Sequence, residues 1–212
     1  MKKISVKGLA DYMTASAAAQ RRLIRQYKYP SEDEARAKIL YYREARDRIE
    51  AFHRRGRDAD WLRSQASNLR GLALLSSVRT RTRLRHNARA LIDYGRNFST
   101  KTFSVLPDIS LSVQYGDLRI TAFPDLYVNE DGESKIIKLD FSKKPLPSDV
   151  PKIICQVFLE ASIQAGMSIQ AKNILLFDVT RGKEYKQARI GARMSRNIEA
   201  TCQTISAVWD TI

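Results

Sequence analysis

Cysteine and histidine are scarce in this chain of 212 residues, which has two of each. Cys155 and Cys202 stand in apolar helical stretches, and neither has a second Cys or His at the spacing of a metal site. We expect both to be reduced thiols in the core. With His53 and His86 as the two imidazoles, and no glycines of a nucleophile elbow, a Ser-His-Asp hydrolase has no support.

Long apolar runs are also absent. The segment Met1–Ser5 begins with basic residues, but no apolar run of signal-peptide length follows it, and no stretch approaches the roughly 18 apolar residues of a membrane span. A glycine loop for phosphates, a dinucleotide fingerprint and a sustained heptad are missing as well. We therefore expect a cytoplasmic protein with no membrane partner.

Acidic residues are too few to balance the basic ones, and the formal net charge is +14. The excess is uneven: residues 1–100 contain 23 Lys and Arg against 10 Asp and Glu, whereas residues 101–212 contain 14 against 13. A basic surface attracts polyanions by releasing their counterions. Nucleic acid is the first expected partner and an anionic membrane surface the second; solubility alone is the alternative.

Arginine is the preferred cation of the N-terminal half, and its planar fork suits bidentate contacts to phosphate. This preference favours nucleic acid over lipid. For the segment from Arg79 to Arg89 a solvated helix face is the alternative, but the spacing of three to four residues and the lack of neighbouring acids favour phosphate contact. The predicted nucleic-acid-binding residues are Arg54, Arg55, Arg57, Arg79, Arg81, Arg83, Arg85 and Arg89.

Helical patterns fill the first 98 residues. Residues 6–28 are predicted to form one amphipathic helix that ends before Pro30. Ser31 to Glu34 form a capping box that predicts a second helix running to about His53. After a break at Gly56, residues 59–97 are again helical, with an interruption expected near Gly71.

Short β-rich runs begin at Phe103. The segments 103–106, 109–115, 118–123 and 135–141 predict an antiparallel meander of about three strands, with turn signals at residues 116–117 and 129–132. A helix capped by Asp149, a strand over residues 171–179 and a helix over residues 185–210 follow. We thus expect a helical basic region (1–100) and an α/β core (101–212) packed as one unit.

Two acidic residues stand out by their placement. Asp125 follows Phe123-Pro124 at the end of one β run, and Asp140 lies within the next. A hairpin can bring both carboxylates to one end of a sheet, where they could bind a divalent cation and, through it, a phosphodiester and its attacking water. Alternatively, Asp125 caps a turn and Asp140 is an edge charge.

The run Ile120 to Val128, a turn, the run Ile136 to Lys144 and a helix with Gln156 together resemble the PD-(D/E)XK nuclease superfamily, especially its RecB-like branch. The resemblance covers roughly residues 103–180 and implies an α+β fold with a restriction-endonuclease-like core. It also implies that Asp125 and Asp140 bind Mg²⁺ or Mn²⁺ and that Gln156 supports the site.

The chain departs from the family pattern at Ser142, where the family has its catalytic lysine. Strand alternation places Lys138, Asp140, Ser142 and Lys144 on one face, so Lys138 or Lys144 could supply the missing ammonium. Lys143 is expected on the opposite face. The alternative is that these lysines are solvated and the site is inactive.

One further residue and one further segment bear on the resemblance. His86 precedes the sheet where the family often has a metal ligand, although a lone helical histidine is more often structural. Residues 6–13 resemble the N-terminal helix of RecB-like proteins, some of which place an iron–sulphur cysteine shortly afterwards. Residues 14–22 contain no cysteine, so we expect no such cluster.

Three functions remain open on this basis. The first is a metal-dependent deoxyribonuclease with a migrated lysine. The second is a DNA-binding module that keeps the nuclease fold without cleaving. The third is an adaptor whose basic helices dock on an acidic protein in a larger complex.

Overall fold

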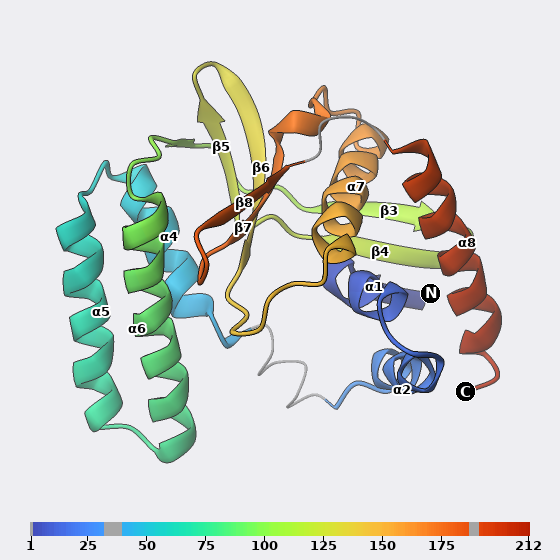
Figure 1. Cartoon of the computed structure of the whole chain (residues 1–212), viewed down its shortest axis with the longest axis horizontal. Coiled ribbons are helices and arrows are strands. Elements are labelled where there is room, and N and C mark those ends of the chain that lie inside the picture. The colour runs from blue at the N-terminus through green and yellow to red at the C-terminus, as the bar shows by residue number, and fades with distance from the viewer. Residues whose placement is uncertain (1, 32–39, 187–190) are drawn as a thin grey trace.

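The computed structural model describes residues 2–31, 40–186 and 191–212, which form a mixed α+β fold of seven α-helices and two mixed sheets (Figure 1). The helices are α1 (Val6–Met13), α2 (Ala17–Lys28), α4 (Arg43–Arg54), α5 (Ala59–Leu74), α6 (Val78–Phe98), α7 (Asp149–Gln164) and α8 (Ala192–Trp209). The strands are β1 (Lys2–Ser5), β2 (Ser104–Val105), β3 (Leu111–Tyr115), β4 (Leu118–Ala122), β5 (Leu126–Glu130), β6 (Glu133–Asp140), β7 (Ile174–Asp178) and β8 (Lys183–Lys186).

The larger sheet has the strand order β2-β5-β6-β7-β8. Its β5–β6 hairpin turns at Asp131 and Gly132, whose φ angles of 54° and 83° are those of the turn that the sequence predicts. The parallel strands β6 and β7 are joined by the crossover helix α7. Because Leu126 pairs with Ile137, the start of β5 and the end of β6 lie at one end of the sheet.

The smaller sheet has the order β1-β4-β3, with β1 parallel and β3 antiparallel to β4. The predicted single meander is therefore wrong: the β3–β4 and β5–β6 hairpins belong to different sheets. The chain changes sheets at Phe123-Pro124, where proline has no N–H for a strand ladder. The described part of the N-terminal region is nearly all helical, as expected; the exception is β1, which forms one edge of this sheet.

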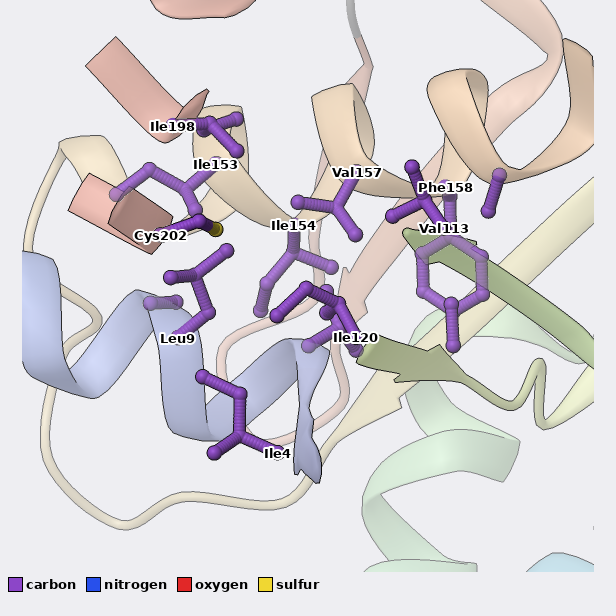
Figure 2. Packing of buried hydrophobic residues seen from close by; sticks show 14 of the residues in the cluster. Ile4, Leu9, Val113, Ile120, Ile153, Ile154, Val157, Phe158, Ile198 and Cys202 are labelled. Atoms are coloured by element: carbon purple, nitrogen blue, oxygen red, sulfur yellow. The ribbon is translucent and has the colours of Figure 1, made fainter. Parts of the chain in front are cut away.

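The larger sheet is covered on both faces. On one face, side chains from β1, α1, the smaller sheet, α7 and α8 form one core. Figure 2 shows part of that core, including Leu9, Ile120, Ile154 and Cys202. Both cysteines are buried and free, as expected for core thiols, and burial raises the pKa of each to about 12.

The opposite face packs against the helices α4, α5 and α6, where the rings of Phe98 and Phe177 stack at 4.4 Å. Successive residues of β6 point to alternate faces, so Ile137 and Leu139 enter the α4–α6 core and Ile136 enters the α7 core. The polar residues Lys138 and Asp140 share the α7 side with Ile136. The strand thereby presents its charges at the end of an otherwise apolar face.

Helix boundaries differ from the predictions near the N-terminus. Residues 6–28 form two helices, because the Thr14 hydroxyl donates to the Ala10 carbonyl at 2.8 Å and the extended Ser16 begins α2. The predicted capping box extends beyond the described residues. Tyr41 and Tyr42 form a turn, so α4 begins at Arg43; it ends at Arg54, close to the predicted end near His53.

Three later boundaries also differ. Helix α5 passes through Gly71 and ends at Leu74, so the break falls at residues 75–77. Ser148 occupies the N-cap of α7, one residue before Asp149. The strand predicted over residues 171–179 begins with a 3₁₀ turn (Ala171–Asn173), and β8 and α8 replace the single helix predicted over residues 185–210.

Candidate functional site

Asp125 lies immediately before β5 and is almost fully buried, with a side chain that is 5% exposed. Its Oδ1 lies 2.8 Å from Arg46 Nε on α4, and its Oδ2 lies 3.0 Å from Lys138 Nζ on β6. The Leu139 amide also donates to Oδ2, at 2.8 Å. Two cations and one backbone N–H therefore lie against the two oxygens of this carboxylate.

Asp140 ends β6 at the same end of the sheet. The Ser142 amide donates to its Oδ2 at 3.0 Å, and the Ser142 hydroxyl donates to its Oδ1 at 2.9 Å. Burial raises the pKa of Asp140, whereas these hydrogen bonds and the nearby Lys7 oppose the rise. Ser142 thus closes a local turn on the carboxylate.

Asp178 and Arg181 stabilise this end of the sheet, although neither residue was predicted from the sequence to belong to the site. Asp178 is fully buried beside Asp140 in the β6–β7 register, and its negative charge adds to the raised pKa of Asp140. Arg181 Nη1 lies 3.2 Å from Asp178 Oδ2 and donates to the Ser142 carbonyl at 3.2 Å. The sequence signal for Asp178 was its position, because it is an acidic residue directly after the apolar run Ile174–Phe177.

The two candidate lysines have different positions. Lys138 is held in the site, where its Nζ also donates to the Phe123 carbonyl at 3.0 Å. Lys144 is exposed and lies in a bend after β6 has ended at Asp140, so strand alternation does not extend to it. Of these two lysines, Lys138 is the one that contacts a candidate carboxylate.

Gln156 is fully buried on α7 and takes part in another polar cluster. Its Nε2 donates to Glu160 Oε1 at 2.7 Å and to Ser195 Oγ at 2.9 Å, and its Oε1 accepts from the Gly191 amide at 3.1 Å. These contacts tie α7 to the start of α8. They give Gln156 a structural role that the sequence pattern does not reveal.

His86 on α6 contacts Tyr41 and Lys143 instead of the carboxylates. Its Nδ1 lies 2.6 Å from the Tyr41 hydroxyl and its Nε2 lies 3.1 Å from Lys143 Nζ. Partial burial, with the Lys143 charge adding to it, lowers the pKa of His86. The ring therefore links α6 to the chain beyond β6.

The carboxylates as arranged do not fit a divalent cation. Mg²⁺ and Mn²⁺ require open oxygen ligands, but the Asp125 oxygens face Arg46, Lys138 and an amide, and those of Asp140 accept from Ser142. Within residues 2–31, 40–186 and 191–212, no three His, Cys, Asp or Glu side chains are grouped to hold a metal. The arrangement is suited to joining structural elements.

The predicted phosphate-binding arginines divide into two sets. Acids pair with three of them: Arg54 with Glu50, Arg83 with Glu44 and Arg89 with Asp93. For Arg83 and Arg89 this corrects the expectation that acids are lacking near residues 79–89. Arg81 donates to the carbonyls of Ala73 and Ser76, both at 3.2 Å. Among the described residues, no carboxylate lies within ion-pair distance of the exposed side chains of Arg55, Arg57, Arg79 and Arg85.

The part of the chain that the structure describes contains no helix with the length and apolar character needed to cross a membrane. No family model matches the chain, and no curated protein matches it in sequence.

Proposed function

We propose that this protein binds DNA without cleaving it, using a PD-(D/E)XK-like core whose carboxylate site has become an internal junction. The observation that carries the proposal is the environment of Asp125, which is 5% exposed and paired with both Arg46 and Lys138. A carboxylate neutralised by two fixed cations is a poor ligand for a third. Its ion pairs instead attach α4 to the β5–β6 hairpin.

Neighbouring contacts strengthen the same junction. Tyr42, at the start of α4, stacks on Phe141 with ring centroids 4.6 Å apart, and Lys143 meets His86 of α6. The end of β6 is thus fixed to the helical unit α4–α6 that carries most of the predicted phosphate-binding arginines. The site would hold those arginines in a defined position relative to the core.

The excess of positive charge supplies the second argument. Exposed arginines without acidic partners release counterions from a polyanion when they contact its phosphates. Arg55, Arg57, Arg79 and Arg85 belong to the helical unit, and the exposed Arg21, Arg22 and Arg25 add to the basic surface on α2. DNA is the partner that this distribution favours.

A metal-dependent deoxyribonuclease is the second candidate. Lys138 favours it, because its ammonium lies 3.0 Å from Asp125 and could replace the lysine that Ser142 displaces. For that function Asp125 would have to release Arg46 and Lys138 when a cation binds. The two candidates therefore differ in whether this ion pair opens.

One set of samples tests both candidate functions, DNA binding without cleavage and metal-dependent cleavage. Duplex binding would be followed by fluorescence anisotropy over a salt series, and plasmid cleavage would be measured with Mg²⁺ or Mn²⁺ for wild type, Asp125→Ala and Asp140→Ala. We expect binding that weakens steeply with salt and no metal-dependent cleavage. Cleavage that both variants abolish would establish the nuclease instead, and a lack of DNA binding and of cleavage would favour an adaptor for an acidic protein.

A further inference from the structure

The α5–α6 hairpin ends in an exposed apolar tip. Four aliphatic side chains lie within seven residues at the turn: Leu72, Leu74, Leu75 and Val78 are 53%, 69%, 90% and 76% exposed. Figure 1 shows this turn at the far end of the hairpin, on the opposite side of the molecule from α8. Apolar side chains gathered on a surface in this way mark a site of interaction.

The tip is held in shape by the chain itself. Arg81 reaches back across the turn and donates to the carbonyls of Ala73 and Ser76, and the Ser76 hydroxyl donates to the Leu72 carbonyl at 2.8 Å. These bonds satisfy carbonyls at the end of α5, which would otherwise lack partners. Leu75 follows as the C-cap residue of α5. The most exposed leucine is thus presented on a fixed turn.

Positive charge surrounds the apolar tip. Residues 61–92 contain seven arginines and no Lys, Asp or Glu. Arg70 lies one helical turn before Leu74 on α5. Arg79 lies in the first turn of α6, and Arg85 lies further along the same helix. All three are exposed, with no carboxylate within ion-pair distance among the described residues. An anionic surface is the complement of this arrangement.

The residue types favour nucleic acid over a lipid bilayer. Residues 62–93 contain no Trp, Tyr or Phe, although aromatic side chains are typical of segments that sit at a membrane interface. Proteins that bend DNA press aliphatic side chains such as leucine against the minor groove and between base steps, while arginines contact the backbone. A leucine-rich tip flanked by arginines matches that chemistry.

We propose that the α5–α6 tip is a wedge that inserts Leu75 between base steps of a DNA duplex while Arg70, Arg79 and Arg85 contact the flanking phosphates. This inference rests on the proposed DNA binding and specifies how the protein would contact the duplex. A two-helix end is wider than the minor groove of about 6 Å, so insertion opens the groove and kinks the duplex.

The test measures bending and binding in one complex. A duplex of about 30 base pairs carries a donor and an acceptor dye at its ends, so bending raises energy transfer while anisotropy reports affinity. Wild type is compared with Leu75→Ser, and Ile163→Ser serves as the matched control because Ile163 is an aliphatic residue, 53% exposed, on α7. Circular dichroism melting confirms that each variant is folded.

Wild type and Ile163→Ser are expected to raise energy transfer, and Leu75→Ser is expected to lose most of the rise. Its affinity should change less than about tenfold, since phosphate contacts dominate binding. Equal bending by Leu75→Ser and wild type, or binding without bending, would overturn the wedge and leave the proposed function intact. If wild type did not bind the duplex, both the wedge and the proposed function would be wrong.

Vesicles of phosphatidylserine and phosphatidylcholine form the second arm of the test. We expect no cosedimentation that depends on Leu75. Vesicle binding that Leu75→Ser abolishes, together with an unbent duplex, would assign the tip to a lipid surface and overturn the wedge.

Discussion

Arg46 and Asp125 join two parts of the chain that are far apart in sequence: Arg46 Nε on α4 lies 2.8 Å from Asp125 Oδ1 at the start of β5. The Arg46 guanidinium also lies 6.0 Å from the centre of the Phe141 ring. Arg46 thus connects the helical unit to the residue before β5 and to the residue after β6. A carboxylate that could serve catalysis serves here as an attachment point.

Removing Asp125 tests that role through stability. Asp125→Ala would leave Arg46 and Lys138 without their carboxylate, with side chains only 31% and 20% exposed, and the Leu139 amide without its acceptor. We expect the free energy of unfolding to fall by about 2–4 kcal/mol. Urea titrations at neutral pH would measure the change.

The matched control lies on the same helix. Asp47 pairs with Arg43 on α4, but both side chains are more than 60% exposed. Asp47→Ala is expected to change the free energy of unfolding by less than about 0.5 kcal/mol. If the two alanine variants lost similar amounts, Asp125 would not be a junction residue.

Much of the α/β half could be predicted from sequence, because local signals there agree with the tertiary structure. The β5–β6 turn, the end of α7 two residues before Gly166 and the apolar run of β7 all follow local patterns. The division into two sheets could not be predicted, because it depends on the pairing of β1 with β4 across more than 100 residues. No local pattern encodes such a partner.

The candidate site was predictable in part for the same reason. Asp125, Lys138 and Asp140 meet because a hairpin aligns them, and a hairpin can be recognised from its turn. Arg46 enters from a helix about 80 positions earlier, and nothing in its sequence context distinguishes it from the other arginines of α4. Whether the carboxylates face a metal or a cation of the protein is therefore a tertiary property.

His53 should make stability depend on pH. It is buried on α4 with its Nε2 2.7 Å from the Tyr94 hydroxyl, and burial lowers its pKa from 6.5 to about 4. The folded state therefore keeps the ring neutral, while the unfolded state takes up a proton below pH 6.5. Stability is fully present above that pH and falls by about 3 kcal/mol as the pH drops to about 4.

Unfolding titrations of His53→Gln between pH 7.5 and 4.5 would isolate this contribution. The variant is expected to be less stable than wild type at pH 7.5, because it loses packing and the contact with Tyr94. It should also lose less stability on acidification, because it cannot take up the proton. If the free energy of unfolding fell equally with pH in the two proteins, His53 would not be the group that causes the loss of stability.

Gly182 tests the link between α6 and β7. Its φ is 64°, and a Cβ added there would lie 2.8 Å from Asn97 Cγ. The Asn97 side chain donates from Nδ2 to the Val179 carbonyl at 2.9 Å, so Gly182→Ala would strain the backbone and displace this bond. We expect a loss of about 2–3 kcal/mol in the free energy of unfolding.

Gly116→Ala is the control for the backbone component. Gly116 has a similar φ of 59°, with no atom within 4 Å of the added Cβ. Its substitution is expected to cost about 1 kcal/mol. Equal losses in thermal or urea unfolding of the two variants would mean that the Asn97–Val179 bond contributes little.

In the proposed complex with DNA, pairing should decide which arginines contribute to affinity. Arg79 and Arg85 have no carboxylate within ion-pair distance among the described residues, whereas Arg54 and Arg89 pair with Glu50 and Asp93. A free guanidinium can contact phosphate at once, but a paired one must first give up its acid. The double variant Arg79→Gln/Arg85→Gln is therefore expected to reduce the slope of log affinity against log salt by about 1.8, the value for two phosphate contacts.

The double variant Arg54→Gln/Arg89→Gln removes the same formal charge and serves as its control. Because both side chains already interact with acids, and substitution frees those acids, we expect its salt slope to fall by less than one phosphate contact, about 0.9. Anisotropy titrations of one duplex at four or more salt concentrations would measure both slopes. Equal reductions in the two variants would show that net charge, and not the placement of free arginines, determines the contact with DNA.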